Sequence, residues 1–342
     1  MRDSGRNERQ SPVALTVTAP QCMFGFAGFD VSCVMTETAQ GEPHAAPALT
    51  IFGPVPSRRL GRSLGIGNVP VKTCSYSCVY CQVGPTPATE IEPRRFWPPG
   101  AVVDAVTRHV RKLRERGEGI DFLTFVPDGE PTLDLGLGEE IDDLRALEIS
   151  IAVISNGSLT WREDVRAALS KADWVSLKVD AADEATWRKV NRPCASLGMS
   201  TVLEGMLEFA REFRGKLVTE TMLVQGLNDG EAAIETVAAF VERLRPAIAY
   251  LAAPTRPPAE PWVRPADEDA FNRAFQRFSG GLPHVELITG FEGAAFGATG
   301  DVVQDLLSIT AVHPMREDAA LRSWPRVGPT AGCSIASWRR VG

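Results

Sequence analysis

The sequence lacks any long hydrophobic run. No stretch of about 18 uninterrupted apolar residues occurs in the 342-residue chain, so we expect no membrane-spanning helix. The segment 1–12 is polar and charged and lacks the apolar core of a secretory signal peptide. These two absences predict a cytoplasmic protein that does not bind a membrane.

An excess of positive charge is also missing. The net charge is −7 at pH 7, which does not favour non-specific adhesion to nucleic acid, because a basic surface supplies most of that affinity. Six basic residues nevertheless lie close together in sequence, namely Arg58, Arg59, Arg62, Lys72, Arg94 and Arg95. They are either solvated loop charges or a site for phosphates or carboxylates, because arginine forks match both anions.

The cysteines do not form a plausible disulfide framework. The chain has seven, an odd number, and three of them fall within eight residues: Cys22, Cys33, Cys74, Cys78, Cys81, Cys194 and Cys333. Such a cluster in a cytoplasmic chain indicates metal or redox chemistry instead.

The chain divides into three predicted parts. Residues 1–48 are expected to be a poorly structured, disordered N-terminal extension, because Glu37–Pro47 is rich in Ala, Pro, Glu and Gly and has no apolar period. A start at Met35 would remove two of the cysteines. An ordered domain is predicted over 49–290, followed over 291–342 by a small C-terminal helical segment and an irregular tail.

Within the ordered part, short apolar runs alternate with amphipathic stretches about six times, a pattern typical of parallel strands joined by helices. The predicted strands are 64–69, 122–126, 151–154, 174–179, 217–224 and 248–252, with one more at 285–288. The predicted helices are 102–113, 141–147, 165–169, 202–213, 232–244 and 267–278. Chemically suggestive residues follow each of the first four predicted strands, which favours a barrel over a doubly wound sheet. We therefore expect an α/β protein with a partial (β/α)6 TIM-type barrel.

The motif that carries the chemistry is Cys74-Ser-Tyr-Ser-Cys78-Val-Tyr-Cys81, with the spacing Cys-x3-Cys-x2-Cys. Three thiolates on one loop can hold three irons of a [4Fe–4S] cluster, and the missing fourth cysteine leaves one iron open to a substrate. The alternative is a zinc site, completed by a distant fourth ligand, in a non-catalytic or regulatory protein.

The sequence resembles the radical S-adenosylmethionine (SAM) superfamily, and within it the wyosine-type tRNA-modifying enzymes and their uncharacterised bacterial relatives. The segments that carry the resemblance are Gly53–Gly65, Lys72–Gln82, Asp128–Leu133, Ile154–Gly157, Val175–Asp180, Asn191–Pro193 and Asp305–Met315. The resemblance implies a partial (β/α)6 barrel, a [4Fe–4S] cluster on Cys74, Cys78 and Cys81, and SAM bound at the open iron.

The resemblance also implies the reaction. One electron, from an external donor such as flavodoxin or ferredoxin, cleaves SAM to a 5′-deoxyadenosyl radical, which abstracts hydrogen from an unidentified substrate. RNA, in particular a tRNA base, is one candidate substrate. The archaeal wyosine enzymes carry further N-terminal cysteines for a second cluster, and Cys22 and Cys33 cannot supply three ligands. This difference and the acidic net charge weaken the inference of wyosine chemistry.

The resemblance further suggests the residues that hold SAM. Gly129 and Glu130 stand where the family uses a Gly-Gly-Glu stretch to receive the amino group of SAM, although Asp128 takes the place of the first glycine. Ser155 and Asn156 would lie near the ribose or the methionine carboxylate. The alternative for Glu130, Ser155 and Asn156 is an ordinary turn.

Two further candidates come from the alternation of side chains along a strand. Lys178 and Asp180 share a face with Ser176, which we expect to point into the barrel. Buried charges are costly unless they are paired or used, so both residues are candidates for contact with substrate or SAM, or form a structural ion pair. Glu220 and Thr221 point to opposite faces, so only one of them can line the site.

Overall fold

The computed structural model describes residues 49–289, which form one eight-stranded sheet with the strands in chain order. The strands are β1 (Thr50–Ser57), β2 (Gly61–Gly67), β3 (Phe122–Phe125), β4 (Ser150–Ser155), β5 (Trp174–Lys178), β6 (Lys216–Met222), β7 (Ile248–Ala252) and β8 (Val285–Ile288). β1 and β2 are antiparallel, and every later neighbour pair is parallel. The predictions for 1–48 and 291–342 lie outside the described residues.

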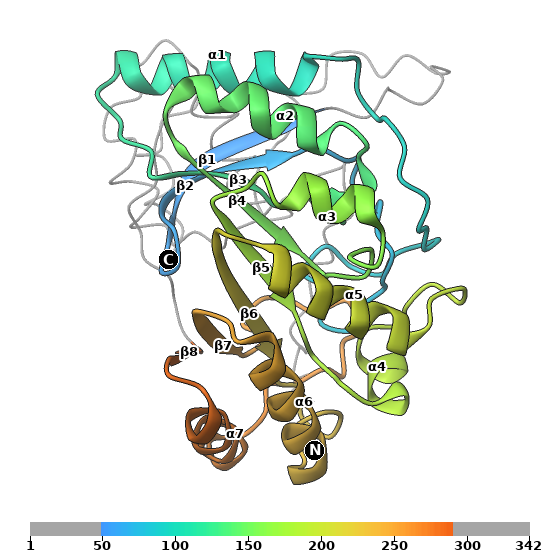
Figure 1. Cartoon of the computed structure of the whole chain (residues 1–342). Coiled ribbons are helices and arrows are strands. Elements are labelled where there is room, and N and C mark those ends of the chain that lie inside the picture. Colours follow the sequence, from blue (N-terminus) through green and yellow to red (C-terminus); the bar gives the residue numbers. More distant parts are fainter. Residues whose placement is uncertain (1–48, 290–342) are drawn as a thin grey trace, which may run out of the picture. The chain divides into compact units, whose positions relative to one another are not determined.

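Helices join the parallel strands on the outer side of the curved sheet, where they follow one another from α1 to α7 (Figure 1). They are α1 (Ala101–Glu115), α2 (Leu137–Leu144), α3 (Glu163–Leu169), α4 (Glu184–Val190), α5 (Met199–Glu212), α6 (Glu231–Leu244) and α7 (Glu268–Gly281), with short 3₁₀ turns at η2 (Pro131–Leu133) and η3 (Arg145–Leu147). β1 and β8 are the two edges of this sheet, so the barrel is open. The predicted α/β class with a partial TIM-type barrel is confirmed.

Periodicity in the sequence explains most of these elements. α1 buries Val102, Val106, Val110 and Leu113, which recur every three or four residues and so form one apolar stripe. The central strands bury nearly every side chain because helices cover one face of the sheet and the barrel interior lies on the other.

Two elements were missed by the sequence analysis. β1 precedes the strand that was expected to be the first, and its two prolines, Pro54 and Pro56, hide the alternating pattern of an edge strand. α4 is a helix of seven residues, too short to give a clear apolar period. No helix among residues 49–289 has the length and hydrophobicity that crossing a bilayer requires.

The turn between β1 and β2 closes the barrel interior at the amino ends of the parallel strands. Leu60 is 3% exposed in this turn. It belongs to a separate hydrophobic cluster with Ala152, Trp174, Val218 and Tyr250, which come from four other strands. Leu60 therefore fills the barrel interior at the amino ends of the parallel strands, and we refer to it as the Leu60 plug.

Replacing Leu60 by alanine should lower the free energy of unfolding by about 2–5 kcal/mol, because the truncated side chain leaves a cavity in the barrel interior. Urea denaturation followed by circular dichroism measures this loss. Leu135, which is 51% exposed, is the matched control, and Leu135→Ala should change stability by less than about 0.5 kcal/mol. Equal midpoints for the two variants would contradict the role of Leu60.

Candidate active site

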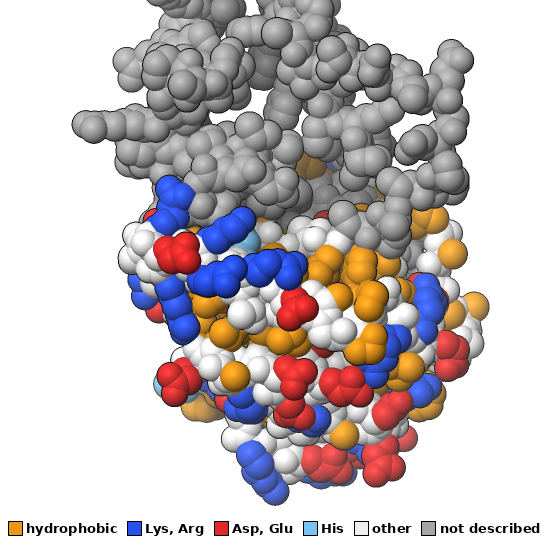
Figure 2. Space-filling view, turned by 90° about the horizontal axis from the view of Figure 1, so that it is seen from above, with side chains coloured by type: hydrophobic (Ala, Val, Ile, Leu, Met, Phe, Trp, Pro, Cys, Tyr) orange, Lys and Arg blue, Asp and Glu red, His pale blue; other side chains and the backbone are white. Residues whose placement is uncertain are grey.

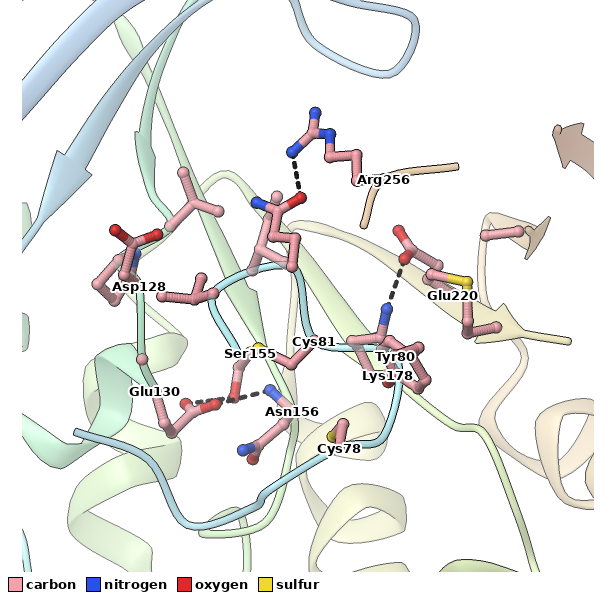
Figure 3. A pocket seen from close by; sticks show the side chains of 18 of the residues that line it. Cys78, Tyr80, Cys81, Asp128, Glu130, Ser155, Asn156, Lys178, Glu220 and Arg256 are labelled. Atoms are coloured by element: carbon pink, nitrogen blue, oxygen red, sulfur yellow. Dashed lines mark hydrogen bonds and ion pairs between the residues drawn. The ribbon is translucent and has the colours of Figure 1, made fainter. Parts of the chain in front are cut away.

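A cavity of about 650 Å³ lies at the carboxyl ends of the parallel strands. This volume is within the range of small-molecule sites. The cavity is lined by eight of the nine residues that the sequence analysis selected: Cys74, Cys78, Cys81, Gly129, Glu130, Ser155, Asn156 and Lys178. Figure 3 shows how several of these side chains converge. The ninth residue, Asp180, is not part of the lining.

The loop after β2 carries the three cysteines, and each sulfur faces a side-chain nitrogen donor; Cys74 Sγ also accepts from Tyr76 N at 3.5 Å. The pairs are Asn156 Nδ2 to Cys74 Sγ at 3.6 Å, Asn191 Nδ2 to Cys78 Sγ at 3.5 Å and Lys72 Nζ to Cys81 Sγ at 3.7 Å. Hydrogen bonds to cysteine sulfur stabilise thiolate ligands and tune the potential of an iron–sulfur cluster. The donor set therefore fits a cluster bound at these three cysteines.

Burial makes the thiols of Cys74 and Cys78 poor nucleophiles by themselves. It raises the pKa of Cys74 to about 12, and the Glu130 carboxylate adds to the shift. Burial also raises the pKa of Cys78, together with the charge of Asp180. A neutral buried thiol is inert, whereas a bound metal centre deprotonates its thiol ligands outright. The environment suits metal ligands better than a covalent nucleophile.

The geometry favours a cluster over a single zinc ion. Within residues 49–289, no three His, Cys, Asp or Glu side chains are grouped around a point where one metal ion could bind. Structural zinc needs four ligands around one ion, whereas each thiolate of a [4Fe–4S] cluster binds a different iron. Three cysteines of one loop, each with a nitrogen donor at its sulfur, agree with the second arrangement.

Glu130 is the best-fixed carboxylate in the cavity. It is 1% exposed, and burial raises its pKa against the opposing effect of its hydrogen bonds. Oε1 accepts from Thr132 N at 3.1 Å, Thr132 Oγ1 at 2.7 Å and Ser155 Oγ at 2.7 Å, while Oε2 accepts from Asn156 N at 2.7 Å. The structure thus joins Glu130, Ser155 and Asn156 into one unit, and Asn156 also connects this unit to Cys74 (Figure 3).

Gly129 permits a close approach between two loops. Lys72 N donates to Asp128 O at 2.7 Å, and Glu130 N donates to Thr73 O at 2.8 Å. A Cβ on Gly129 would lie 2.2 Å from Thr73 O, so only glycine fits between these hydrogen bonds. The cysteine loop and the Glu130 loop are thereby held together.

Lys178 and Asp180 have different positions. Lys178 lines the cavity and its Nζ lies 2.6 Å from Glu220 Oε1. Asp180 accepts from Asn191 Nδ2 at 2.7 Å, from Met222 N at 2.8 Å and from the Tyr80 hydroxyl. Asp180 therefore positions Tyr80 and Asn191, which lie beside the cysteines. Its contact with substrate or SAM stays a prediction. β5 ends at Lys178, so strand alternation no longer fixes the direction of Asp180.

Five of the six basic residues separate into two groups, and the sixth, Arg58, is exposed. Three form ion pairs on the surface, Arg62 with Asp121, Arg94 with Glu90 and Arg95 with Glu139, as expected of solvated charges. Arg59 and Lys72 instead line the cavity. The face shown in Figure 2 carries basic and acidic side chains together. The sequence placed Arg59 in this basic group but gave no sign of its pairing with Glu220 or of Asn191 as the donor to Cys78, because both contacts join distant segments.

Comparison with known proteins agrees with this geometry. A family model described as the radical SAM superfamily matches residues 68–237. A UPF0026 protein of Methanocaldococcus jannaschii is 46% identical over 269 residues, which span 78% of this chain and 83% of that protein. The chain is a radical SAM protein of the UPF0026 family. It is therefore an enzyme that uses a [4Fe–4S] cluster and SAM, as the sequence predicted, and the zinc alternative is set aside.

Solved structures agree on the fold of this radical SAM protein. A structure of TYW1 with a lysine–pyruvate adduct bound has a TM-score of 0.51 and 18% identity, over 65% of this chain and 74% of that one. A radical SAM methyltransferase from Sphaerobacter thermophilus has a TM-score of 0.51 and 17% identity, over 66% of each chain. At this level of identity the likeness concerns the barrel alone.

Replacing Gly129 by alanine should reduce iron binding, because the new methyl group must displace the Thr73 carbonyl beside the cysteine loop. We expect clearly less than about four irons per chain after anaerobic reconstitution, measured by iron analysis and visible absorption. A matched control is Gly230→Ala, since a Cβ at Gly230 has open space around it. If the Gly129 variant bound as much iron as this control, the close approach would not matter for the cluster.

Proposed function

We propose that this protein reductively cleaves SAM at a cluster held by Cys74, Cys78 and Cys81, and that the resulting 5′-deoxyadenosyl radical abstracts hydrogen from a second substrate. The observation that carries the proposal is the cavity in which three cysteines, each with a nitrogen donor at its sulfur, lie beside the fixed carboxylate of Glu130. When bound, the cluster supplies the electron that breaks the sulfonium C–S bond.

Glu130 is the residue that we assign to the amino group of SAM. Its carboxylate is held by four hydrogen bonds and needs no reorganisation when a cation approaches. Ser155 and Asn156 fix the orientation of this carboxylate. Asn156 also links it to Cys74, because its Nδ2 contacts the Cys74 sulfur. The apolar part of the lining, including Phe52, excludes water from the space where a radical would form.

The reaction needs an electron donor and a hydrogen donor. We propose a flavodoxin or ferredoxin as the one-electron donor. A tRNA base is one candidate for the hydrogen donor, supported by the likeness of the barrel to TYW1. Incubation of the reduced enzyme with deuterated candidate RNAs and peptides, followed by mass spectrometry of 5′-deoxyadenosine, identifies the substrate through deuterium transfer. A reduced enzyme that forms no 5′-deoxyadenosine from SAM would refute the proposal.

Cys78→Ala should abolish both the cluster and the formation of 5′-deoxyadenosine, because two thiolates cannot hold a site-differentiated [4Fe–4S] cluster. Iron analysis and chromatography of the reaction products measure the two losses separately. Cys194, a free cysteine that does not line the cavity, is the control, and Cys194→Ala should retain both properties. Full activity of Cys78→Ala would show that the ligands are wrongly assigned.

Glu130→Gln should weaken SAM binding by about ten- to a hundredfold, because a hydrogen bond to a charged group is replaced by one to a neutral amide. Equilibrium dialysis with labelled SAM on the reconstituted enzyme measures the affinity. Iron content should stay near that of the wild type, because Glu130 is not a ligand. An unchanged SAM affinity would remove Glu130 from the SAM site.

A further inference from the structure

Two cations share one carboxylate in the wall of the cavity. Lys178 Nζ lies 2.6 Å from Glu220 Oε1, and Arg59 Nη1 pairs with Glu220 Oε2. Although burial opposes ionisation of Glu220, Lys178 and Arg59 outweigh it and lower the pKa of this carboxyl to about 2. Glu220 is therefore ionised at neutral pH, and each of its oxygens is already occupied by one cation.

The two cations keep more donors than Glu220 can use. A guanidinium carries five N–H donors and an ammonium three. Of the Arg59 side chain, only Nη1 donates a hydrogen bond, and its buried Nε has no partner among the described residues. Lys178 Nζ donates to Glu220 and otherwise lies 5.0 Å from the centroid of the Tyr80 ring. Both groups can therefore accept a further anionic partner.

The nearby carboxylate of Asp180 does not fill this role. Its oxygens accept from Asn191, Met222 and the Tyr80 hydroxyl, and among residues 49–289 it forms no ion pair with Lys178 or Arg59. The charge of Asp180 is thus met by neutral donors, while the two cations have Glu220 as their common ion-pair partner.

The cations lie away from the residues that we assign to SAM. In Figure 3, Lys178 and Glu220 lie on one side of Cys81, and Glu130 with Ser155 and Asn156 lies on the other. Arg59 extends from the turn at the amino ends of the strands, directly before the Leu60 plug. The ion cluster therefore lies in the wall of the cavity, where Arg59 reaches it from the side of the plug and Lys178 lies beside Tyr80 of the cysteine loop.

We propose that Arg59 and Lys178 bind an oxyanion, a carboxylate or a phosphate, that belongs to the substrate of the radical reaction. This inference rests on the proposed function and names the substrate class. Guanidinium and ammonium groups are the usual partners of both anions, and the apolar walls strengthen the attraction. Glu220 holds the two cations in place before the substrate arrives. The anchored anion leaves the uncharged part of the substrate facing the cysteine loop, next to Tyr80.

A purely structural ion cluster would behave differently in the wild-type enzyme. If Arg59 and Lys178 served only to hold β6 against the turn, Glu220 would satisfy both cations and the wild-type enzyme would bind no anion. If the cations recognise an anion, the wild-type enzyme binds it, and Glu220→Gln tightens this binding because it removes an internal competitor. Anion binding by the wild-type enzyme therefore separates the substrate role from a role in folding.

The experiment is isothermal titration calorimetry on the anaerobically reconstituted enzyme, with inorganic phosphate in one arm and acetate in the other at constant ionic strength. Wild-type enzyme should bind at least one of the two anions. Arg59→Met should weaken that binding by about tenfold or more, and Glu220→Gln should strengthen it by a similar factor. Arg62→Met, which removes a charge from the same hairpin at an exposed ion pair with Asp121, should leave anion affinity unchanged.

Each outcome decides a different point. Binding of phosphate alone or acetate alone identifies the anion, whereas binding of neither, or no effect of Arg59→Met and Glu220→Gln, overturns the inference. If Arg59→Met does not fold, the double variant Arg59→Met, Glu220→Gln takes its place, because it removes the charge of Glu220 together with that of Arg59. The double variant should bind the anion more weakly than Glu220→Gln alone. Formation of 5′-deoxyadenosine by the same wild-type preparation tests the proposed function independently, because cleavage without anion binding refutes only the oxyanion site.

Discussion

Hydrogen bonds between two backbone segments, 72–73 and 128–130, hold the cysteine loop against the loop after β3. These segments belong to different strand–helix units, and the absence of a side chain at Gly129 lets them meet. The three cysteine sulfurs and the Glu130 carboxylate consequently have a fixed relation that does not depend on a bound cofactor. Asn156 belongs to the same junction, because it donates to Glu130 and lies beside Cys74.

Three buried carboxylates line or support this region, and their partners determine what each can do. Glu130 and Asp180 receive only neutral N–H and O–H donors, so their negative charge remains to act on the surroundings. Glu220 is neutralised by two cations and acts as their holder. Three carboxylates of one barrel, after β3, after β5 and within β6, thus have different partners and different charge environments.

Features formed by residues close together in the sequence could be predicted, whereas contacts between distant residues could not. The three cysteines fall within eight residues, so their spacing alone indicated a metal site, and the apolar runs of the buried parallel strands indicated the barrel. Pro54 and Pro56 interrupt the strand pattern of β1, so this strand was not predicted. The side-chain direction of Asp180 could not be predicted, because β5 ends at Lys178. The pairing of Arg59 with Glu220 joins residues 161 positions apart, and no pattern in the sequence encodes such a contact.

Arg59 and Leu60 are adjacent residues in one short turn, and both line the cavity, but Leu60 also belongs to a hydrophobic cluster with residues of four strands. A change in the length or conformation of that turn would shift both residues at once. The hairpin therefore couples the lining of the cavity to the packing of the barrel interior. The segment after β7 contributes Arg256 to the cavity without belonging to that cluster, so a substitution there can alter the lining and leave the cluster intact.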